Sequence, residues 1–513
     1  MSTSQDASGA IASPPGDRAF FGHPSGLSTL FFTEMWERFS YYGMRAILIL
    51  YMTKSFAEGG LGFDERYASL IYATYVSSVW YLPLLGGWLA DKIFGARRAV
   101  LLGGIVIASG HYAMAINSKI TFFAGLILIA CGTGLLKPNI SAMVGQLYSD
   151  NDKRRDAGFS IFYMGINLGA FLSPIVVGFL AQGAWFKNMI SSMGMNPNSS
   201  WHWGFGAAGV GMTLGILQYL LGGKKLAHVG HKPAERSSAI DVEPSEKLDM
   251  VTVVLAVVGG VGGAGLGMYF GEAGVVSALF PTVVGIFAGY LIGTTRLLNG
   301  DELKRVLVIF ILFIFSILFW MTYEQAGSSM SLFADRLTAT TIFGWAYPSR
   351  WFQAVPAIFV IILAPVLGAI WQSLAERQPS SPGKFTIGLF FAGIAFAVIA
   401  FASTLTGGGR VSPMWLVVVY FLQTIGELCL SPVGLSTVTK LSPKRMVGLM
   451  LGVWFLSISI GSYIAGQAAR LFEGNNPAVL TKAFGIFAGV TLAAALILAI
   501  LTPLIKKMTP KAA

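Results

Sequence analysis

The chain has 513 residues, of which 54% are hydrophobic and only 12% are charged. Because soluble proteins carry about 25% charged residues, this composition excludes an ordinary soluble domain and predicts a multi-pass membrane protein. Its apolar runs are too long for barrel strands of about 10 residues, so the membrane spans are predicted to be helices.

The first 26 residues are polar and rich in Ser, Pro and Gly. They lack the charged start, short apolar core and cleavage site of a secretory signal, so the first membrane helix is predicted to be retained. We expect residues 1–26 to form a disordered cytoplasmic tail.

Runs of about 20 apolar residues predict fourteen membrane spans in three groups. They lie near 28–53, 67–89, 97–117, 121–148, 158–181 and 203–222, then 249–270 and 275–295, and finally 304–333, 349–373, 385–405, 413–438, 446–470 and 481–505. The predicted fold is therefore an all-α membrane protein with two six-helix bundles and two extra helices between them. The domains are an N-terminal bundle (27–222), a cytoplasmic linker with the two extra helices (223–303), a C-terminal bundle (304–505) and a cytoplasmic tail (506–513).

Basic residues set the predicted orientation. With the N-terminus inside, 23 of the 35 Lys and Arg residues fall in cytoplasmic segments and nine in outside loops. Because cytoplasmic loops of membrane proteins are enriched in Lys and Arg, both termini are predicted to be cytoplasmic in the inner cell membrane. These anchors also explain the net charge of +11 without a nucleic-acid partner.

An internal repeat supports the division into two bundles. The segment from Gly132 to Pro138 aligns with that from Gly426 to Pro432 at an offset of 294 residues. Each is followed by a basic loop and another apolar span, which indicates two homologous halves.

The first span carries a polar stripe of five residues, Glu34, Glu37, Arg38, Tyr41 and Arg45. Their spacing of i, i+3, i+4, i+7 and i+11 places them on one face of a helix. An unpaired charge at membrane depth costs about 2.5–3.5 kcal/mol, so this face predicts a pathway, a binding site or a proton relay. A self-neutralised contact between helices is the alternative that the pattern leaves open.

Lys137, Glu324 and Glu427 are further ionisable residues inside predicted spans. If all the charged residues face one cavity, the carboxylates outnumber the fixed cations by one, and the extra carboxylate can hold a proton. The sequence does not decide which carboxylate it is. A zwitterionic substrate would suit the remaining charges, with cations meeting its carboxylate and Glu427 its ammonium. Buried salt bridges between helices remain the alternative.

The loop from Gly86 to Arg98 contains Asp91 beside small and basic residues. Small residues permit close helix approach, so we interpret the loop as a gate; an ordinary positive-inside loop is the alternative. Two cysteines and five scattered histidines provide no metal-ligand spacing and no catalytic set. The sequence therefore predicts neither an enzyme nor a bound cofactor.

Several segments resemble the proton-dependent oligopeptide transporter family of the major facilitator superfamily. EMWERFSYYG from Glu34 to Gly43 resembles its ExxERFxYYG signature, and FYMGINLG from Phe162 to Gly169 resembles FYxxINxG. The loop after Gly86 and the segment after Gly426 resemble two further family motifs. Order and spacing agree over nearly the whole chain.

The resemblance implies a proton-driven importer of di- and tripeptides that works by alternating access and functions as a monomer in the lipid bilayer. It implies proton coupling by Glu34, Glu37 and Arg38. Substrate binding would involve Tyr41, Arg45, Lys137, Tyr163, Asn167, Trp320, Glu427, Ser431 and Trp454. Gating would involve Arg45, Glu324 and Asp91.

Val355-Pro356 stands where the family often has Asn-Pro, which shifts expected recognition of the peptide amine towards Asn167 and Glu427. Another small solute, such as an amino acid, a drug or nitrate, remains a same-fold alternative, although nitrate would need only cations. A multi-pass membrane enzyme and a channel are further alternatives.

Overall fold

The computed structural model describes residues 18–149, 152, 154–231, 249–270, 275–342, 344–374, 377–443, 446–472 and 476–508. Most of the predicted N-terminal tail, the linker residues 232–248 and the last five residues lie outside this range. Predictions about those segments stay predictions.

The first half contains six long helices close to the predicted spans. They are α1 (Ser25–Thr53), α2 (Glu65–Leu89), α3 (Ala96–Met114), α4 (Lys119–Gln146), α5 (Arg155–Gln182) and α7 (Ser200–Leu221). A short helix, α6 (Ala184–Ser192), escaped prediction because its nine residues cannot form a span. A π-helical turn (Ala90–Phe94) and 3₁₀ turns at Phe56–Glu58, Pro197–Ser199 and Gly223–Leu226 complete this half.

The second half repeats this plan with irregular pieces at one end. Its helices are α11 (Gly300–Tyr323), α12 (Ser329–Arg336), α13 (Val355–Leu374), α14 (Ser381–Thr404), α15 (Met414–Leu441), α16 (Val447–Ala468) and α17 (Pro477–Met508). Strands β1 (Thr341–Ile342) and β2 (Trp345–Ala346) form a small antiparallel hairpin. The 3₁₀ turns are Glu324–Gly327, Ser349–Ala354, Leu405–Gly408 and Ala469–Phe472.

The predicted span 304–333 corresponds to the candidate span Gly300–Arg336, but this span is not one unbroken helix. Helix α11 ends at Tyr323, and a 3₁₀ turn separates it from α12. Ser328, with φ −121° and ψ −96°, lies outside the helical region and breaks the chain between the two helices. The break leaves Glu324 at a helix end instead of on a helix face.

Within the described residues, twelve helices are long and apolar enough to cross a membrane. The remaining two predicted spans correspond to α1, which carries four charged side chains, and α3, which begins with two arginines. Both helices pack into the first bundle, where most of α1 is buried. The prediction of a helical membrane fold is confirmed.

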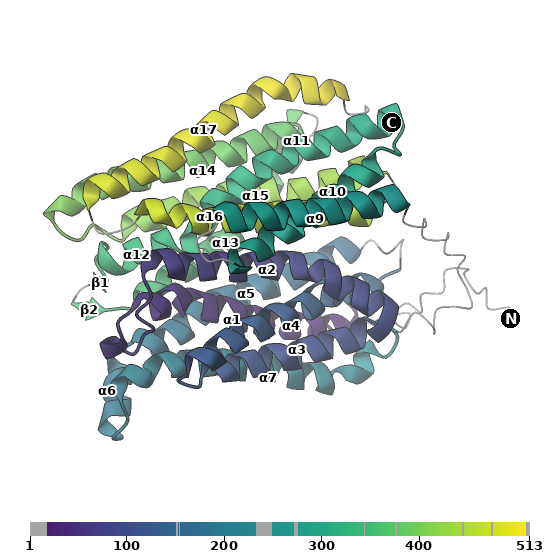
Figure 1. Cartoon of the computed structure of the whole chain (residues 1–513). Coiled ribbons are helices and arrows are strands. Elements are labelled where there is room, and N and C mark those ends of the chain that lie inside the picture. The colour runs from purple at the N-terminus through teal and green to yellow at the C-terminus, as the bar shows by residue number, and fades with distance from the viewer. Residues whose placement is uncertain are drawn as a thin grey trace.

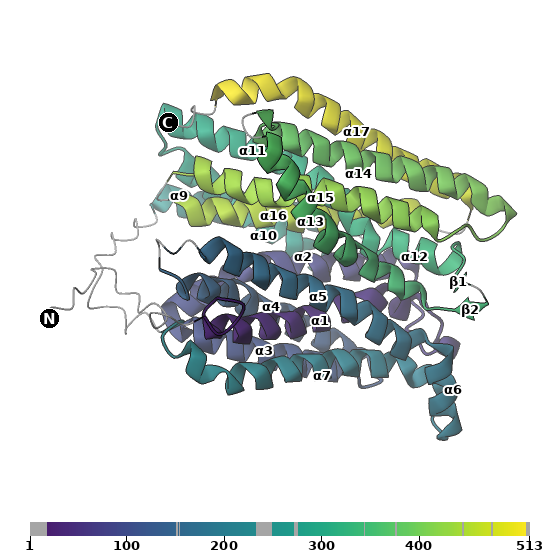
Figure 2. The ribbon, with the colours of Figure 1, turned by 180° about the vertical axis from the view of Figure 1, so that it is seen from behind.

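The two bundles lie side by side along their length, the first in purple and blue and the second in green and yellow (Figure 1). Helix α2 meets α16 on one side of the boundary, and α5 meets α13 on the other, which is seen from behind in Figure 2. If only the six long helices of each half are counted, the second helix of each half thus contacts the fifth helix of the other. Helix α6 and the β hairpin lie at one end of the molecule, and α17 ends at the opposite end.

A reciprocal pair of serines joins α2 to α16. The Ser77 hydroxyl donates to the Ser459 carbonyl oxygen at 3.0 Å, and the Ser459 hydroxyl donates to the Ser77 carbonyl oxygen at 2.9 Å. Both side chains are fully buried. Farther along the same contact, a Cβ on Gly466 would lie 2.1 Å from the Cβ of Ala73, so the two backbones approach closely there.

The two extra helices, α9 (Met250–Phe270) and α10 (Val275–Thr295), form a hairpin outside the bundles (Figure 1). Their backbones touch because glycines recur at every fourth position of both helices, which is a packing mode of membrane helices. A Cβ on Gly259 would lie 2.1 Å from the Gly285 carbonyl oxygen, and one on Gly263 would lie 2.1 Å from that of Pro281. Helix α10 continues the contact inward, where Phe280 stacks on Tyr463 of α16 at 4.4 Å.

Matching glycine contacts support the internal repeat. A Cβ on Gly132 of α4 would lie 2.6 Å from the Gly103 carbonyl oxygen of α3. In the second half, a Cβ on Gly426 of α15 would lie 2.7 Å from the Gly388 carbonyl oxygen of α14. The aligned glycines therefore make the same close helix approach in both bundles.

Residues 18–24, which we expected to belong to the disordered tail, fold against the first bundle. Phe20 and His23 form a β-bridge, and the His23 Nδ1 lies 2.9 Å from the Tyr148 hydroxyl. The disordered tail therefore does not extend to residue 26.

Candidate functional site

The polar stripe of α1 faces the interior of the protein. Glu34, Glu37 and Arg38 are 2%, 1% and 3% exposed, and Tyr41 is equally buried. Their helical spacing, predicted from the sequence, brings them onto one face. Three acidic or basic side chains buried this deeply are stable only if they pair with one another or with charges on other helices.

Arg38 is the centre of this cluster. Its Nε lies 3.1 Å from Glu34 Oε1 and also binds Glu37. The guanidinium lies 5.3 Å from the centroid of the Tyr41 ring, in cation–π geometry. One oxygen of each carboxylate and the Arg38 Nη2 have no hydrogen-bond partner among the described residues. The cluster neutralises itself only in part, and it retains free positions for a proton or a polar ligand.

Arg45 connects the two bundles. Its guanidinium pairs with Glu324 of the second half, and its Nε donates to the Tyr72 hydroxyl at 2.6 Å. The broken helix after Tyr323 makes this contact possible, since it brings Glu324 and Gly327 against α1 and α2. A Cβ on Gly327 would lie 1.7 Å from the Tyr72 hydroxyl oxygen.

Lys137 lies against an aromatic ring that the sequence analysis did not single out. Its Nζ is 3.3 Å from the centroid of the Trp80 ring, and it has no hydrogen-bond partner among the described residues. Lys137 also interacts electrostatically with Glu34, Glu37 and Glu324. An ammonium that contacts a ring face and has no hydrogen-bond partner among the described residues is available to a substrate carboxylate.

Glu427 on α15 is the other carboxylate that the second half contributes to the site, besides Glu324. The Tyr323 hydroxyl donates to its Oε2 at 2.6 Å. Glu427 also interacts with Tyr163 and Tyr42, which lie across the boundary on α5 and α1. Tyr163 is 43% exposed, so this part of the site is open to the outside of the molecule.

Asn167 lies one helical turn beyond Tyr163 on α5. Its Nδ2 donates to the Tyr163 carbonyl oxygen at 2.9 Å, and the side chain is 7% exposed. This arrangement leaves the amide oxygen available as an acceptor. Ser431, half-buried, lies one turn beyond Glu427 on α15.

The aromatic candidates divide into two groups. Trp320 lies at the boundary, with its ring centroid 5.2 Å from that of Tyr323 and 6.5 Å from that of Trp80. Trp454 instead packs inside the second bundle, where its ring contacts Gly434 and Phe385. The structure therefore does not bring Trp454 together with the other candidates; its neighbour Phe455 stacks on Trp80 at 6.3 Å.

Further polar contacts join the halves at the end that carries α6 and the β hairpin. Arg336 Nη1 lies 2.5 Å from Glu65 Oε1, and Lys54 Nζ lies 3.7 Å from Asp335 Oδ2. Arg350 is 1% exposed and donates through Nη1 to the Ala46 carbonyl oxygen of α1 at 2.7 Å. Together with Arg45 and Glu324, these contacts close this end.

Sequence reasoning missed Trp80, Arg350 and Glu65. Trp80 was missed because aromatic residues are common in apolar spans. Arg350 was one of the nine basic residues that the orientation count assigned to outside loops. Its place at the start of an apolar run was the available signal. The side chain of Asp91, the third predicted gating residue, lies outside the described range, although its backbone belongs to the π-helical turn.

A model of the POT family matches residues 97–486, which is more than half of the chain. The chain belongs to the POT family. The resemblance to this family is thereby confirmed, and the matched residues include the segments after Phe162 and Gly426.

Relatives of this POT chain cover nearly its full length. The uncharacterized transporter YclF of Bacillus subtilis (strain 168) is 40% identical over 507 residues, 98% of each chain. The peptide transporter YePEPT of Yersinia enterocolitica is 39% identical over 474 residues, 88% of each chain. A di-/tripeptide transporter of Lactococcus lactis subsp. cremoris is 35% identical over 509 residues, 96% of this chain and 98% of that one.

Solved structures agree with the sequence relatives. A peptide transporter POT in complex with alafosfalin matches with a TM-score of 0.83 and 42% identity, over 97% of this chain and 98% of that one. A POT family transporter in complex with 5-aminolevulinic acid matches with a TM-score of 0.79 and 35% identity, over 95% and 98%. The two-bundle fold with an extra hairpin is therefore that of POT transporters.

Proposed function

We propose that this POT chain is a proton-coupled symporter that imports di- and tripeptides by alternating access. The observation that carries the proposal is the meeting of opposite charges from both bundles. Arg45 and Lys137 of the first half lie with Glu324 and Glu427 of the second around one buried region. A zwitterionic peptide presents charges of both signs, so it can bridge the halves in a way that a single anion cannot.

The proton-coupling role falls to Glu34, Glu37 and Arg38. Two carboxylates share one guanidinium in a region excluded from water, and each carboxylate has one free oxygen. Two carboxylates facing one cation leave a net negative charge, which protonation of either one removes. Proton binding and release there can therefore alter the pairing of Arg38 and the packing of α1.

Peptide binding falls to the residues between this cluster and Glu427. Lys137 and Arg45 provide cations for the peptide carboxylate, while Glu427 and the free oxygen of Asn167 provide acceptors for the amine. Trp320, Tyr41, Tyr163 and Ser431 border the same region. Val355 begins α13 and packs against the apolar core of the second half, so it supplies no polar group for the amine.

The structure represents the state closed at the α6 end, which we propose to be the outer side of the inner cell membrane. The Arg45–Glu324 pair, the Arg336–Glu65 pair and Arg350 hold this end together. Both chain termini would then be cytoplasmic, in agreement with the distribution of basic residues. We also propose that the chain acts as a monomer, is not an enzyme and uses the proton as its coupling ion without a bound cofactor.

Uptake of labelled dialanine into proteoliposomes, with and without an imposed inward proton gradient, tests the function. We expect accumulation above equilibrium only with the gradient, and competition by tripeptides but not by single amino acids, nitrate or drugs. Uptake inhibited by one of those solutes and not by peptides would reassign the substrate. Release of split label without vectorial movement would favour an enzyme.

Glu37→Gln tests the coupling role directly. We expect it to abolish gradient-driven accumulation while dialanine counterflow persists, because the amide cannot bind and release a proton. Glu302→Gln is a matched control, since this half-buried residue lies outside the charged site, caps α11 and can be replaced by Gln in the same capping box. Full accumulation by Glu37→Gln would remove Glu37 from the coupling role.

A further inference from the structure

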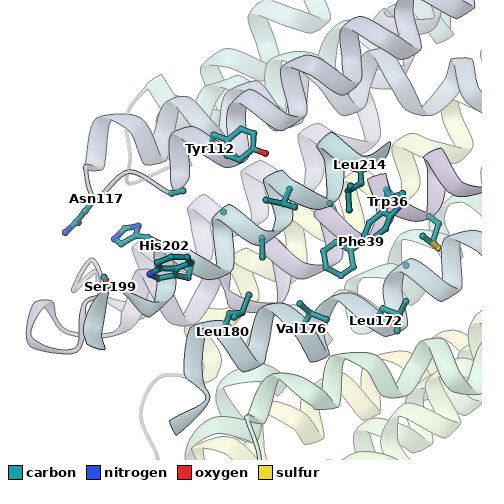
Figure 3. A pocket seen from close by; sticks show the side chains of 18 residues that line it. Trp36, Phe39, Tyr112, Asn117, Leu172, Val176, Leu180, Ser199, His202 and Leu214 are labelled. Carbon is teal, nitrogen blue, oxygen red and sulfur yellow. The ribbon is translucent and has the colours of Figure 1, made fainter. Parts of the chain in front are cut away.

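A long apolar groove runs along the first bundle (Figure 3). Its volume is about 890 Å³, which lies within the range of small-molecule sites. The groove is bordered by α5 and α7, with α3 at one edge, and its floor is α1. The floor residues Met35, Trp36 and Phe39 project from α1 opposite to Glu34 and Arg38.

The groove opens to the hydrocarbon of the membrane. Both α5 and α7 are candidate membrane spans, and the side chains along the opening, such as Val176, Val210 and Leu214, are 40–51% exposed. Along α7 the lining runs from Ser199 to Leu214, a distance of about 22 Å at 1.5 Å per residue. This length exceeds half of the hydrocarbon core, about 15 Å, so the groove can take a full acyl chain.

Polar groups gather at one end of the groove only. Asn117, Ser199 and His202 lie at the α6 end, and the remainder of the lining is almost wholly apolar (Figure 3). The His202 Nδ1 donates to the Met114 carbonyl oxygen at 3.2 Å, which leaves Nε2 of the neutral ring as a hydrogen-bond acceptor. Trp203, 47% exposed, and Trp185, 64% exposed, lie near this end, as aromatic residues do at the level of lipid head groups.

We propose that this groove is a binding site for one membrane phospholipid. Its acyl chain lies between α5 and α7 against the floor of α1, and its ester region accepts a hydrogen bond from the Asn117 amide. The polarity of the groove matches that of a phospholipid, with an apolar body at membrane depth and a polar end at the interface. The site is independent of the peptide-binding region and of the proposed transport activity.

Gly206→Leu blocks the groove. A Cβ on Gly206 would have only the Ala115 Cβ nearby, at 3.7 Å, so the larger side chain enters the groove without a backbone clash. Gly489→Leu is the matched control, because Gly489 on α17 has no atom within 4 Å of an added Cβ and lies outside the groove. Both variants insert the same side chain into the surface of a membrane helix.

Native mass spectrometry of the full chain, purified in mild detergent with phospholipid added, measures the bound lipid. We expect one retained phospholipid on the wild type and on Gly489→Leu, and at least a tenfold lower occupancy on Gly206→Leu. Equal occupancy in all three proteins, or detergent adducts alone on the wild type, would overturn the proposal.

A second measurement needs no variant. A phospholipid with a photoactivatable acyl chain is irradiated with the wild-type protein in vesicles, and the labelled peptides are identified. We expect the label on residues 199–214 and 169–180 to exceed that on α17 at least fivefold. Uniform labelling of the lipid-facing helices would overturn the proposal even if Gly206→Leu fails to fold.

Discussion

The ion pair between Arg45 and Glu324 is the contact whose loss we expect to open the outer end. Its side chains are only 11% and 3% exposed. Removal of one partner from a buried pair costs about 3–5 kcal/mol. Because the Tyr72 hydroxyl still binds Arg45, we take the lower end of this range for Glu324→Gln, which corresponds to about a 100-fold shift away from the closed state.

Electron–electron distance measurements between spin labels check this shift. Labels at Ala184→Cys and Gly408→Cys mark the outer end of each half, where Ala184 is exposed and an added Cβ on Gly408 meets no atom within 4 Å. Cys131 and Cys429 are first replaced by Ala. We expect one short distance in the parent protein and a dominant longer distance after Glu324→Gln.

Glu65→Gln provides the matched control. It removes the carboxylate of another ion pair at the same end, but Arg336 and Glu65 are 27% and 24% exposed. This pair is only partly buried, and pairs near the protein surface contribute about 0–1 kcal/mol, so its loss should shift the equilibrium by about fivefold at most. An unchanged short distance in Glu324→Gln, or equal shifts in both variants, would refute the reasoning from burial.

Three further outcomes are expected. Trp80→Leu removes a cation–π contact of about 2 kcal/mol with Lys137. Because this contact competes with the peptide carboxylate for the Lys137 ammonium, the KM for dialanine should fall by up to about 30-fold. A higher KM would contradict this. Gly285→Leu places a Cβ 2.0 Å from the Gly259 carbonyl oxygen and so forces α9 and α10 apart. The melting temperature of the protein should fall while dialanine uptake persists. Loss of uptake would show that the hairpin is needed for transport. Burial and the nearby Arg154 hold the pKa of His23 below its usual 6.5, so the folded state favours the neutral imidazole. The contribution of His23 to folding stability is therefore complete above pH 6.5 and declines below it. Hydrogen exchange at residues 18–26, corrected for intrinsic rates, should be faster at pH 5 than at pH 8.

The fold could be predicted because membrane helices can be recognised by the length and apolar composition of their segments. Most helix bounds lie within four residues of the predicted spans. The break inside the span 304–333 could not be predicted, because apolar composition reports depth in the bilayer, whereas the break after Tyr323 depends on the backbone angles of Ser328 and on contacts with the other half. Such a break in an apolar run leaves no signal in hydropathy.

From the sequence, only the charged residues of the site could be predicted. Buried charges in apolar helices are rare enough to mark Glu34, Arg45 and Lys137 from the sequence alone. Aromatic residues have no such contrast, so Trp80 was missed and Trp454, which packs in a bundle core, was included. Their roles depend on which face of a helix meets the other half, and that is a property of the assembled fold.

The serine pair between α2 and α16 has a consequence for how the halves move. Each hydroxyl finds its acceptor on the opposite helix, so separating the helices at this point would leave two donors unsatisfied in hydrocarbon. Interhelical hydrogen bonds in membranes contribute about 0.6 kcal/mol on average and at most about 1.7, so the pair resists separation but tolerates rotation. Ser77 and Ser459 can thus serve as a pivot point between α2 and α16. The two bundles can rotate about it, so that the outer end opens while the opposite end closes.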